Sequence, residues 1–204
     1  PAVRQTYDDM EEDMFALLTG KELVTAETAA AASMKCRQIT SGALYHDKVD
    51  PLTGEPRTGP REWTEIHDQK VDAACDLVEE LQGQQLLIGY EFGHERDRLT
   101  AALAKVLGAE PPCIGGKTSD KKALLYEAAW NAGEIPVLLG HPASMGHGLN
   151  FQKSSAYNVL WVSGTWDYEL YDQFIRRLLR QGNTAAHLIV HQLVFRNSVD
   201  EAVV

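Results

Sequence analysis

The sequence predicts an α/β fold in which a parallel sheet is covered by helices on both faces. Residues 85–92, 135–140 and 157–162 form short apolar runs, with the length and composition of strands buried on both sides. Amphipathic segments of helical length separate such runs, for example residues 94–108 and 119–133. Strands that alternate with helices in this way form parallel sheets, because each crossover helix packs back onto the sheet.

Before this α/β region, the chain predicts helices up to about residue 45. Four apolar residues at helical spacing precede Gly20: Met10, Met14, Leu17 and Leu18. An alanine-rich second segment has high helix propensity and closes at Gly42. Residues 46–66 contain three prolines and two glycines, which predicts a loop or mobile insertion that serves as a hinge. We therefore expect a helical extension with its loop at residues 1–66 and the α/β domain at residues 67–204.

The remaining elements of the α/β domain follow in the same alternation. Helices are predicted at residues 68–83 and 167–182, and strands at residues 113–114 and 185–195, with residues 197–204 beginning a last helix. Ligands of such sheets bind beyond the carboxyl ends of the strands. The chemistry is therefore expected in four loops, at residues 89–94, 115–119, 140–150 and 163–167.

Composition excludes several classes of protein. The formal net charge of −10 and the pI of about 5.1 argue against a generic basic nucleic-acid binder, whose affinity comes from phosphate neutralisation. Three cysteines without a CxxC pair indicate neither a disulfide framework nor a metal site. The polar first residues and the absence of a long apolar run predict a cytoplasmic protein without a membrane span. A start at Pro1 rather than Met suggests a piece of a longer chain.

The residues Gly116, Lys117 and Thr118 resemble the end of a phosphate-binding P-loop, but the spacing is wrong. The pattern GxxxxGK[ST] needs a glycine at position 111, where the sequence has Pro111. Two interpretations stay open. The segment is either a short loop whose Lys117 and Thr118 touch a nucleic-acid phosphate, or an exposed turn.

The predicted helix at residues 167–182 carries an unusual basic stretch. Gln173, Arg177 and Arg180 are spaced to share one helical face, and residues 173–183 contain three arginines and no carboxylate. Such arginines at the carboxyl edge of a sheet would suit the γ-phosphate of a nucleotide. A solvated basic face is the alternative. Upstream, Gly146 and Gly148 permit either a plain turn or the close approach of a ligand.

The order of these segments resembles motifs V and VI of superfamily-two helicases, and in particular their Swi/Snf-like branch. The pattern GxGLN is followed by an apolar strand, a tryptophan-bearing loop and QxxxRxxRxGN, in which Asn183 stands for the usual glutamine. Residues 35–45 resemble the Leu-Arg-Gln-Ile segment of that branch, and residues 129–152 resemble its phage and prophage members. The resemblance extends from about Tyr7 to Val204.

This resemblance implies a RecA-like second motor domain with defined roles for nine residues. Arg177 and Arg180 would be arginine fingers, and Gln173 would contact the γ-phosphate. The loop that couples nucleotide to nucleic acid would contain Gly146, Gly148 and Asn150. Nucleic acid would be contacted by Lys117, Thr118 and Trp166.

The resemblance also implies ATP and Mg²⁺ as cofactors, shared with an N-terminal RecA-like domain in cis or in trans, and duplex DNA as a partner. This chain has neither a Walker A lysine at the right spacing nor an Asp-Glu box, so we expect no ATP hydrolysis by the isolated chain. Its acidic charge predicts weak DNA binding alone. The alternative is a non-catalytic module that binds nucleic acid or protein and retains the motor fold. A purely structural assembly protein is a third possibility, against which the Gln-Arg-Arg set argues. The expected location is the cytoplasm of a bacterium or of a phage-infected host cell.

Overall fold

The computed structural model describes residues 3–5, 7–9, 11–12, 26–46, 61–145 and 148–203. The chain divides into two compact units, which are described one at a time. The first comprises Pro1–Gln69 and Phe195–Ala202, and the second comprises Lys70–Val194 and Val203–Val204. The apolar residues Met10 to Leu18 that predict a first helix, and residues 47–60 of the predicted hinge loop, lie outside the described residues.

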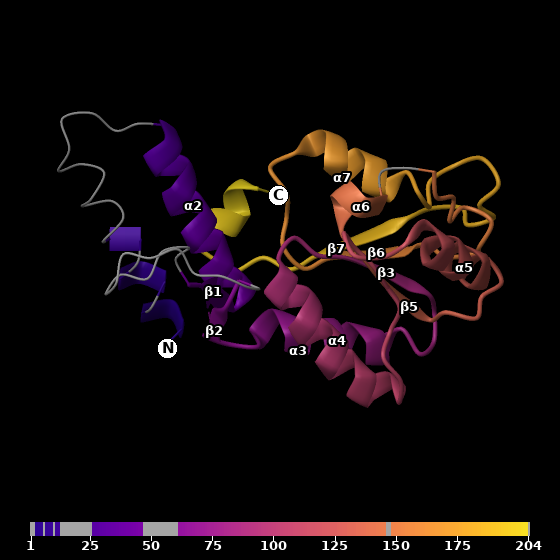
Figure 1. Ribbon diagram of the computed structural model, residues 1–204, viewed down its shortest axis with the longest axis horizontal. Coiled ribbons are helices and arrows are strands. Elements are labelled where there is room, and N and C mark those ends of the chain that lie inside the picture. Colours follow the sequence, from indigo (N-terminus) through magenta and orange to yellow (C-terminus); the bar gives the residue numbers. More distant parts are fainter. Residues whose placement is uncertain are drawn as a thin grey trace. The chain divides into compact units, whose positions relative to one another are not determined.

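The second unit is built on a five-stranded sheet whose strand order is β4-β5-β3-β6-β7 (Figure 1). Every neighbouring pair of strands is parallel, which confirms the predicted fold class. The strands are short, and the three central ones are buried along their whole length. Their bounds are Leu86–Gly89 for β3, Cys113–Ile114 for β4, Val137–Gly140 for β5, Asn158–Trp161 for β6 and Ile189–Gln192 for β7.

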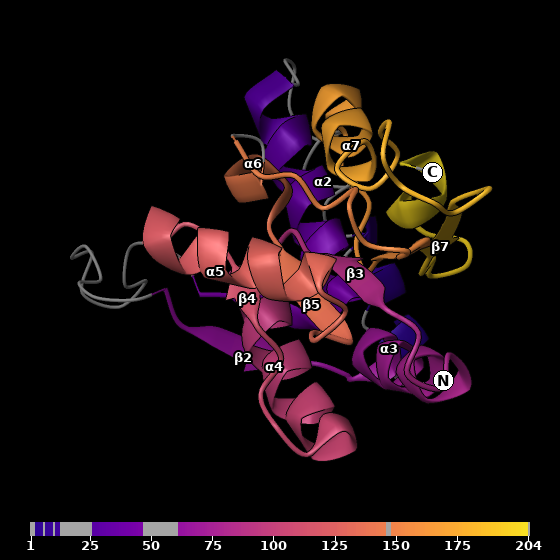
Figure 2. The same cartoon turned by 90° about the vertical axis from the view of Figure 1, so that its right-hand side faces the viewer.

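Alternate side chains of the strands enter two apolar cores, one on each face of the sheet. Helices α3 (Gln69–Glu80) and α4 (Gly93–Leu107) cover one face, with Leu99 and Leu103 fully buried against it. The opposite face is covered by α5 (Asp120–Asn131), α6 (Pro142–Met145) and α7 (Tyr168–Ile175) (Figures 1 and 2).

Two glycines at the ends of neighbouring strands make room for α7. Gly89 of β3 and Gly140 of β5 are direct partners in the sheet. A Cβ at Gly89 would lie 3.2 Å from the ring of Phe174, and a Cβ at Gly140 would lie 3.1 Å from the same ring and overlap the sulfur of Met145. Phe174 therefore rests directly on the sheet backbone, and this contact fixes the height of α7 above the carboxyl edge.

Helix α7 is shorter than the sequence predicts. It begins at Asp167, whose carboxylate accepts hydrogen bonds from two backbone N–H groups of the first turn, and it ends at Ile175 rather than at residue 182. Beyond Ile175 the backbone continues in tighter turns, with a bond from Arg177 N to Phe174 O at 3.1 Å. The prediction that Gln173, Arg177 and Arg180 share one helical face is therefore wrong. Tertiary contacts of the residues after Ile175, described below, override their helix propensity.

The last predicted strand is also shorter, since β7 occupies Ile189–Gln192 within the predicted residues 185–195. The expected final helix is a single 3₁₀ turn at Val199–Ala202. Residues 195–202 follow the second unit in sequence but belong to the first unit. The local sequence therefore could not indicate where this turn is located.

The first unit contains α2 (Ala26–Ser41) and a small antiparallel sheet. Helix α2 ends before Gly42, which has the left-handed φ of 99° that glycine favours. The strands β1 (Ala43–Tyr45) and β2 (Trp63–Glu65) pair with each other, although no strand is predicted there from the sequence. The missed signal is the aromatic and β-branched pair Trp63-Thr64, hidden beside a segment rich in proline and glycine.

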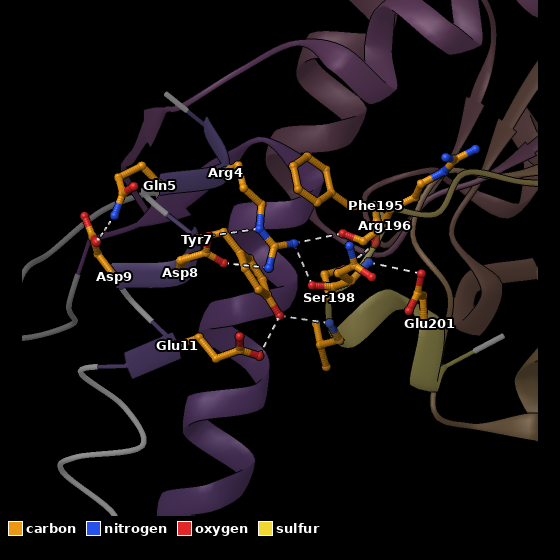
Figure 3. Close-up of polar contacts among 12 residues, drawn as sticks. Arg4, Gln5, Tyr7, Asp8, Asp9, Glu11, Phe195, Arg196, Ser198 and Glu201 are labelled. Atoms are coloured by element: carbon orange, nitrogen blue, oxygen red, sulfur yellow. Dashed lines mark hydrogen bonds and ion pairs between the residues drawn. The ribbon is translucent and has the colours of Figure 1, made fainter. Parts of the chain in front are cut away.

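Within the same unit, residues from the two ends of the chain are hydrogen-bonded together (Figure 3). The Arg4 guanidinium donates to the carbonyls of Arg196 and Asn197 at 2.9 and 2.6 Å and also pairs with Asp8. The Tyr7 hydroxyl, which is buried, accepts a hydrogen bond from the backbone N–H of Val199 at 2.9 Å. These bonds satisfy backbone groups of a turn that forms no ladder of its own.

Candidate functional site

The described residues of the predicted site fall in different parts of the α/β unit. Lys117, Thr118 and Trp166 lie in the loops after β4 and β6, beyond the carboxyl ends of those strands. The segment after β5 and the turns after α7 meet near the C-terminal end of α5. Asn150 belongs to the first of these and Arg180 to the second. The Nη1 of Arg180 donates a hydrogen bond to Asn150 Oδ1 at 2.9 Å, and both side chains are accessible to solvent. The structure thus joins the two segments that the sequence motifs predicted to work together.

Arg177 has a different environment from Arg180. It is 6% exposed, and its Nη1 donates to the backbone carbonyl of Leu149 at 3.0 Å. Burial, followed by the nearby charge of Arg180, lowers the pKa of its guanidinium. The side chain therefore braces the segment of residues 148–150 from below, while Arg180 contacts it from the solvent side. The role of Arg177 as an arginine finger stays a prediction.

The other two polar residues of this basic stretch are paired along α7. The Nε2 of Gln173 donates to Glu169 at 2.9 Å, one turn earlier on the helix. Arg176 forms an ion pair with Asp172 at 2.5 Å, also one turn earlier. The expectation of three arginines away from any carboxylate is thus wrong for Arg176. The two carboxylates precede residue 173 in sequence, and the helix places each of them one turn away from its partner.

The turn that carries Arg180 is closed by Gly182 and Asn183. Gly182 has a φ of 113°, a backbone conformation that L-residues other than glycine rarely adopt. The Asn183 amide donates to the carbonyls of Ala156 and Leu178 at 2.9 and 3.0 Å, and its oxygen accepts from Ala185 N. The short side chain of Asn183 therefore ties the turn to the residues that precede β6. Asparagine at this position thus has a structural role within the turn.

The turn after β4 is held by Thr118. Its hydroxyl donates to the carbonyl of Cys113 at 3.1 Å and accepts from Gly115 N at 3.0 Å. Because the hydroxyl proton is used inside the turn, the side chain that this turn presents to solvent is the exposed Lys117. A Cβ at Gly115 would lie 2.5 Å from the hydroxyl of Tyr90, so this position requires glycine. Contact of Lys117 and Thr118 with nucleic acid stays a prediction.

Of the remaining predicted residues, Trp166 and Gly148 lie in separate loops. Trp166, in the loop after β6, is 54% exposed. Gly148 has a φ of 74°, so its backbone conformation favours glycine. Gly146 lies outside the described residues. Asn150 is hydrogen-bonded to Arg180, whereas Lys117 and Trp166 lie in two other loops, after β4 and β6.

Sequence reasoning missed a buried carboxylate at the carboxyl edge of the sheet. Glu95, in the first turn of α4, is fully buried, and its Oε2 accepts hydrogen bonds from the backbone N–H groups of Glu91 and Phe92. Its Oε1 accepts a bond of 2.5 Å from the hydroxyl of Ser163, in the loop after β6. Glu95 thus ties together the loops of two neighbouring strands. A glutamate at the third position of a helix is a known capping signal and could have indicated part of this role.

The exposed guanidinium of Arg180 is the kind of group that suits an anionic oxygen. Across residues 3–5, 7–9, 11–12, 26–46, 61–145 and 148–203, no group of three or more His, Cys, Asp or Glu side chains could hold a metal.

Comparison with known structures places the fold among RecA-like domains of the SWI2/SNF2 type. The C-terminal part of the Fun30 ATPase domain matches all of this chain and 84% of its own, with a TM-score of 0.70 and 14% identity. The SWI2/SNF2 ATPase core of Sulfolobus solfataricus in complex with dsDNA matches 98% of this chain and 40% of its own, with a TM-score of 0.69 and 20% identity. The C-terminal domain of that ATPase matches 99% of this chain and 78% of its own, with a TM-score of 0.64 and 18% identity.

Comparison of sequences finds a relative in a phage. The putative protein p41 of Acyrthosiphon pisum secondary endosymbiont phage 1 is 36% identical over 205 residues, which cover 98% of this chain. This chain spans 39% of the length of that relative. No protein-family model matches the chain.

None of the helices described by the structure could cross a membrane.

Proposed function

We propose that this chain is the C-terminal motor domain of a Swi/Snf-like, DNA-dependent ATPase. In this proposal it closes on an N-terminal RecA-like domain, in cis or in trans, and supplies arginines and DNA-coupling loops to a shared ATP site. The observation that carries the proposal is the contact between Arg180 and Asn150, which joins the two predicted motif segments on a RecA-like parallel sheet. The likeness to SWI2/SNF2 C-terminal domains supports it.

In this proposal the two candidate fingers have different tasks. Arg180 is exposed and is held by one neutral amide oxygen, so its guanidinium retains donors for a γ-phosphate. Charge that develops on the transferred phosphoryl group would be stabilised by such a group, with the bound metal neutralising the phosphates from the facing domain. Arg177 keeps the segment of residues 148–150 at the correct height, and its own contact with phosphate would require it to leave Leu149.

Contact with DNA would come from the turns after β4 and β6. Lys117 presents its ammonium group from the turn after β4, and Trp166 presents an exposed ring after β6. The solved Sulfolobus solfataricus core was determined in complex with dsDNA. With a net charge of −10, this chain is proposed to bind duplex DNA through local contacts of this kind, completed by the facing domain.

The test is ATPase activity measured with and without duplex DNA, for this chain alone and for this chain combined with its N-terminal RecA-like domain. DNA-stimulated turnover is expected in the combination and not in the isolated chain. Arg180→Ala should lower kcat by about 10³-fold or more, the range seen when an arginine finger is lost. Arg176→Ala is the matched control and should retain activity, because Arg176 is exposed and ion-paired with Asp172.

Near-normal turnover of Arg180→Ala would overturn the arginine-finger assignment. DNA binding by the combination without any ATP turnover would favour the alternative, a non-catalytic module that retains the motor fold.

A further inference from the structure

One side chain of α5 holds the residue that contacts Arg180. Asn131, at the C-terminal end of this helix, donates a hydrogen bond of 2.8 Å from Nδ2 to the backbone carbonyl of Asn150. The side-chain oxygen of the same Asn150 accepts the bond from Arg180. A continuous chain of hydrogen bonds therefore leads from α5 through Asn150 to the exposed guanidinium.

The neighbouring residue of α5 fixes the continuation of the same segment. Trp130 is fully buried; its Nε1 donates to the hydroxyl of Ser154 at 3.1 Å, and its ring meets Phe151 edge to face. The backbone beyond Asn150 is thus anchored to the end of α5 by a rigid aromatic contact. The bond from Asn131 extends this anchorage to Asn150 and so determines where its side chain is presented.

Closer to the start of α5, the same segment is not packed tightly against the helix. A pocket of about 220 Å³ is lined on one side by Asp120 and Leu124 and on the other by Gly148 and Leu149. The hydrogen bonds of Trp130 and Asn131 attach the segment to the C-terminal end of the helix. Movement of α5 would be transmitted to Asn150 at this end.

The other end of α5 begins directly at the turn that presents Lys117. Ser119 caps the helix by accepting a bond from Lys122 N, and Thr118, its neighbour, holds the turn after β4. A helix of 12 residues is about 18 Å long at 1.5 Å per residue. This rigid element therefore joins the turn predicted to contact nucleic acid to the residue that orients Arg180.

We infer that Asn131 is a positioning residue, which aims Asn150 at Arg180 and makes α5 the mechanical connection between the nucleic-acid turn and the arginine. The inference rests on the proposed function for its role in catalysis. The connection itself is a property of this chain, and it can be measured without turnover.

The first experiment uses the full 204-residue chain with ¹⁵N-labelled arginine and asparagine. NMR signals of the Arg180 Nε–H and of the Asn150 side-chain amide are compared between the wild type, Asn131→Ala and Asn131→Asp. Both substitutions should shift these signals, with Asn131→Asp producing the larger change. The aspartate has the same shape but places an oxygen against the Asn150 carbonyl in place of a donor. Unshifted signals in both variants would overturn the inference.

Gln85→Ala is the matched control. The Gln85 amide donates to the carbonyls of Trp130 and Ile135 at 3.0 and 2.9 Å, so its loss removes similar bonds at the same end of α5 without touching Asn150. It should leave the Arg180 signal in place. If it shifts that signal as much as Asn131→Asp does, the effect belongs to the stability of α5, and the positioning role is wrong.

The second experiment measures steady-state ATPase of the chain combined with its N-terminal RecA-like domain, with a 40-base-pair duplex as the activator. Asn131→Asp should lower the DNA-stimulated kcat about tenfold and leave the KM for ATP within about twofold, because the lost interaction acts in the transition state. An unchanged kcat, or an equal loss in Gln85→Ala, would overturn the role in coupling. A wild-type combination that shows no turnover would contradict the proposed function, while the NMR comparison would still decide whether Asn131 positions Arg180.

Discussion

Arg180 and Asn150 are joined by a hydrogen bond of 2.9 Å, although 30 residues separate them in sequence. The acceptor is a neutral amide oxygen, so the guanidinium keeps its charge available to a ligand. A carboxylate in the same place would compete with a phosphate for the arginine. Asparagine at position 150 thus balances two properties: it contacts Arg180, and it adds no negative charge beside the guanidinium.

This balance predicts that Asn150→Asp is more harmful than Asn150→Ala. The aspartate should form a charge-assisted pair with Arg180 and lower kcat of the combined motor by at least about tenfold, since such pairs are roughly twice as strong as neutral hydrogen bonds. The alanine should mainly loosen Arg180. Steady-state ATPase of the two variants beside Arg180→Ala provides the measurement. Equal activity of the aspartate and alanine variants would contradict this account of Asn150.

Replacement of Arg177 should destabilise the fold, whereas replacement of Arg180 should not. Removing a buried, hydrogen-bonded guanidinium leaves the Leu149 carbonyl without its donor, so Arg177→Ala is expected to lower the free energy of unfolding by about 2 kcal/mol or more. Arg180→Ala, at an exposed position, should change it by less than about 0.5 kcal/mol. Urea unfolding of the three proteins, followed by circular dichroism, measures both values. Similar values for the two variants would show that Arg177 is not a brace.

The difference between these two arginines could not be read from the sequence. Their spacing predicts one helical face, and a continuous helix would have exposed both. In the structure α7 ends at Ile175, because Phe174 is anchored on Gly89 and Gly140 and the following residues turn toward the segment after β5. These are long-range contacts, and no local pattern encodes them.

Other features followed from local rules and were predictable. Continuous apolar runs predicted the buried strands, whereas the predicted end of a helix at Gly182 is wrong, since α7 ends at Ile175. The roles of Glu95 and Asn131 were missed. Each joins segments that are distant in sequence, and the capping signal at Glu95 indicates its local bonds but not its bond to Ser163.

The close packing of Phe174 on Gly140 predicts that even the addition of one methyl group at position 140 strongly destabilises the fold. Gly140→Ala would place a methyl group into the sulfur of Met145 and against the Phe174 ring, and it should lower the free energy of unfolding by roughly 1–3 kcal/mol, the usual cost of overpacking. Thermal or urea unfolding checks this. Gly116→Ala is the control and should be nearly neutral, because its Cβ would meet nothing within 4 Å. A stable Gly140→Ala variant would mean that α7 can lift from the sheet without cost.

His94 predicts a loss of stability at mildly acidic pH. Burial, and secondarily the charge of Arg98, lowers the pKa of this imidazole to about 3 from an ordinary value of 6.5. Between these values the unfolded chain binds a proton that the folded chain does not, so folding is penalised as the pH falls below 6.5, and the penalty is complete near pH 3. The slope reaches about 1.4 kcal/mol per pH unit.

The comparison of wild type with His94→Gln isolates this contribution, since other acid-sensitive groups are common to both. Between pH 7.5 and pH 5.0 the wild type should lose about 2 kcal/mol more of its free energy of unfolding than the variant, because roughly 1.5 units of that interval lie below 6.5. Urea unfolding at the two pH values measures the difference. Parallel losses in both proteins would show that His94 is protonated without penalty.

Lys117 predicts a specific change in the salt dependence of DNA binding. If its ammonium group neutralises one phosphate, Lys117→Ala should weaken duplex binding by the combined motor and reduce the slope of log K against log salt by about 1. Lys105→Ala is the control of equal charge. Lys105 lies in the last turn of α4, on the other face of the sheet, where the helix has run back toward the amino edge. An equal reduction of the slope in both variants would mean that net charge, rather than the turn after β4, determines how the protein meets DNA. Fluorescence anisotropy of a labelled duplex, titrated at several salt concentrations, separates these two cases.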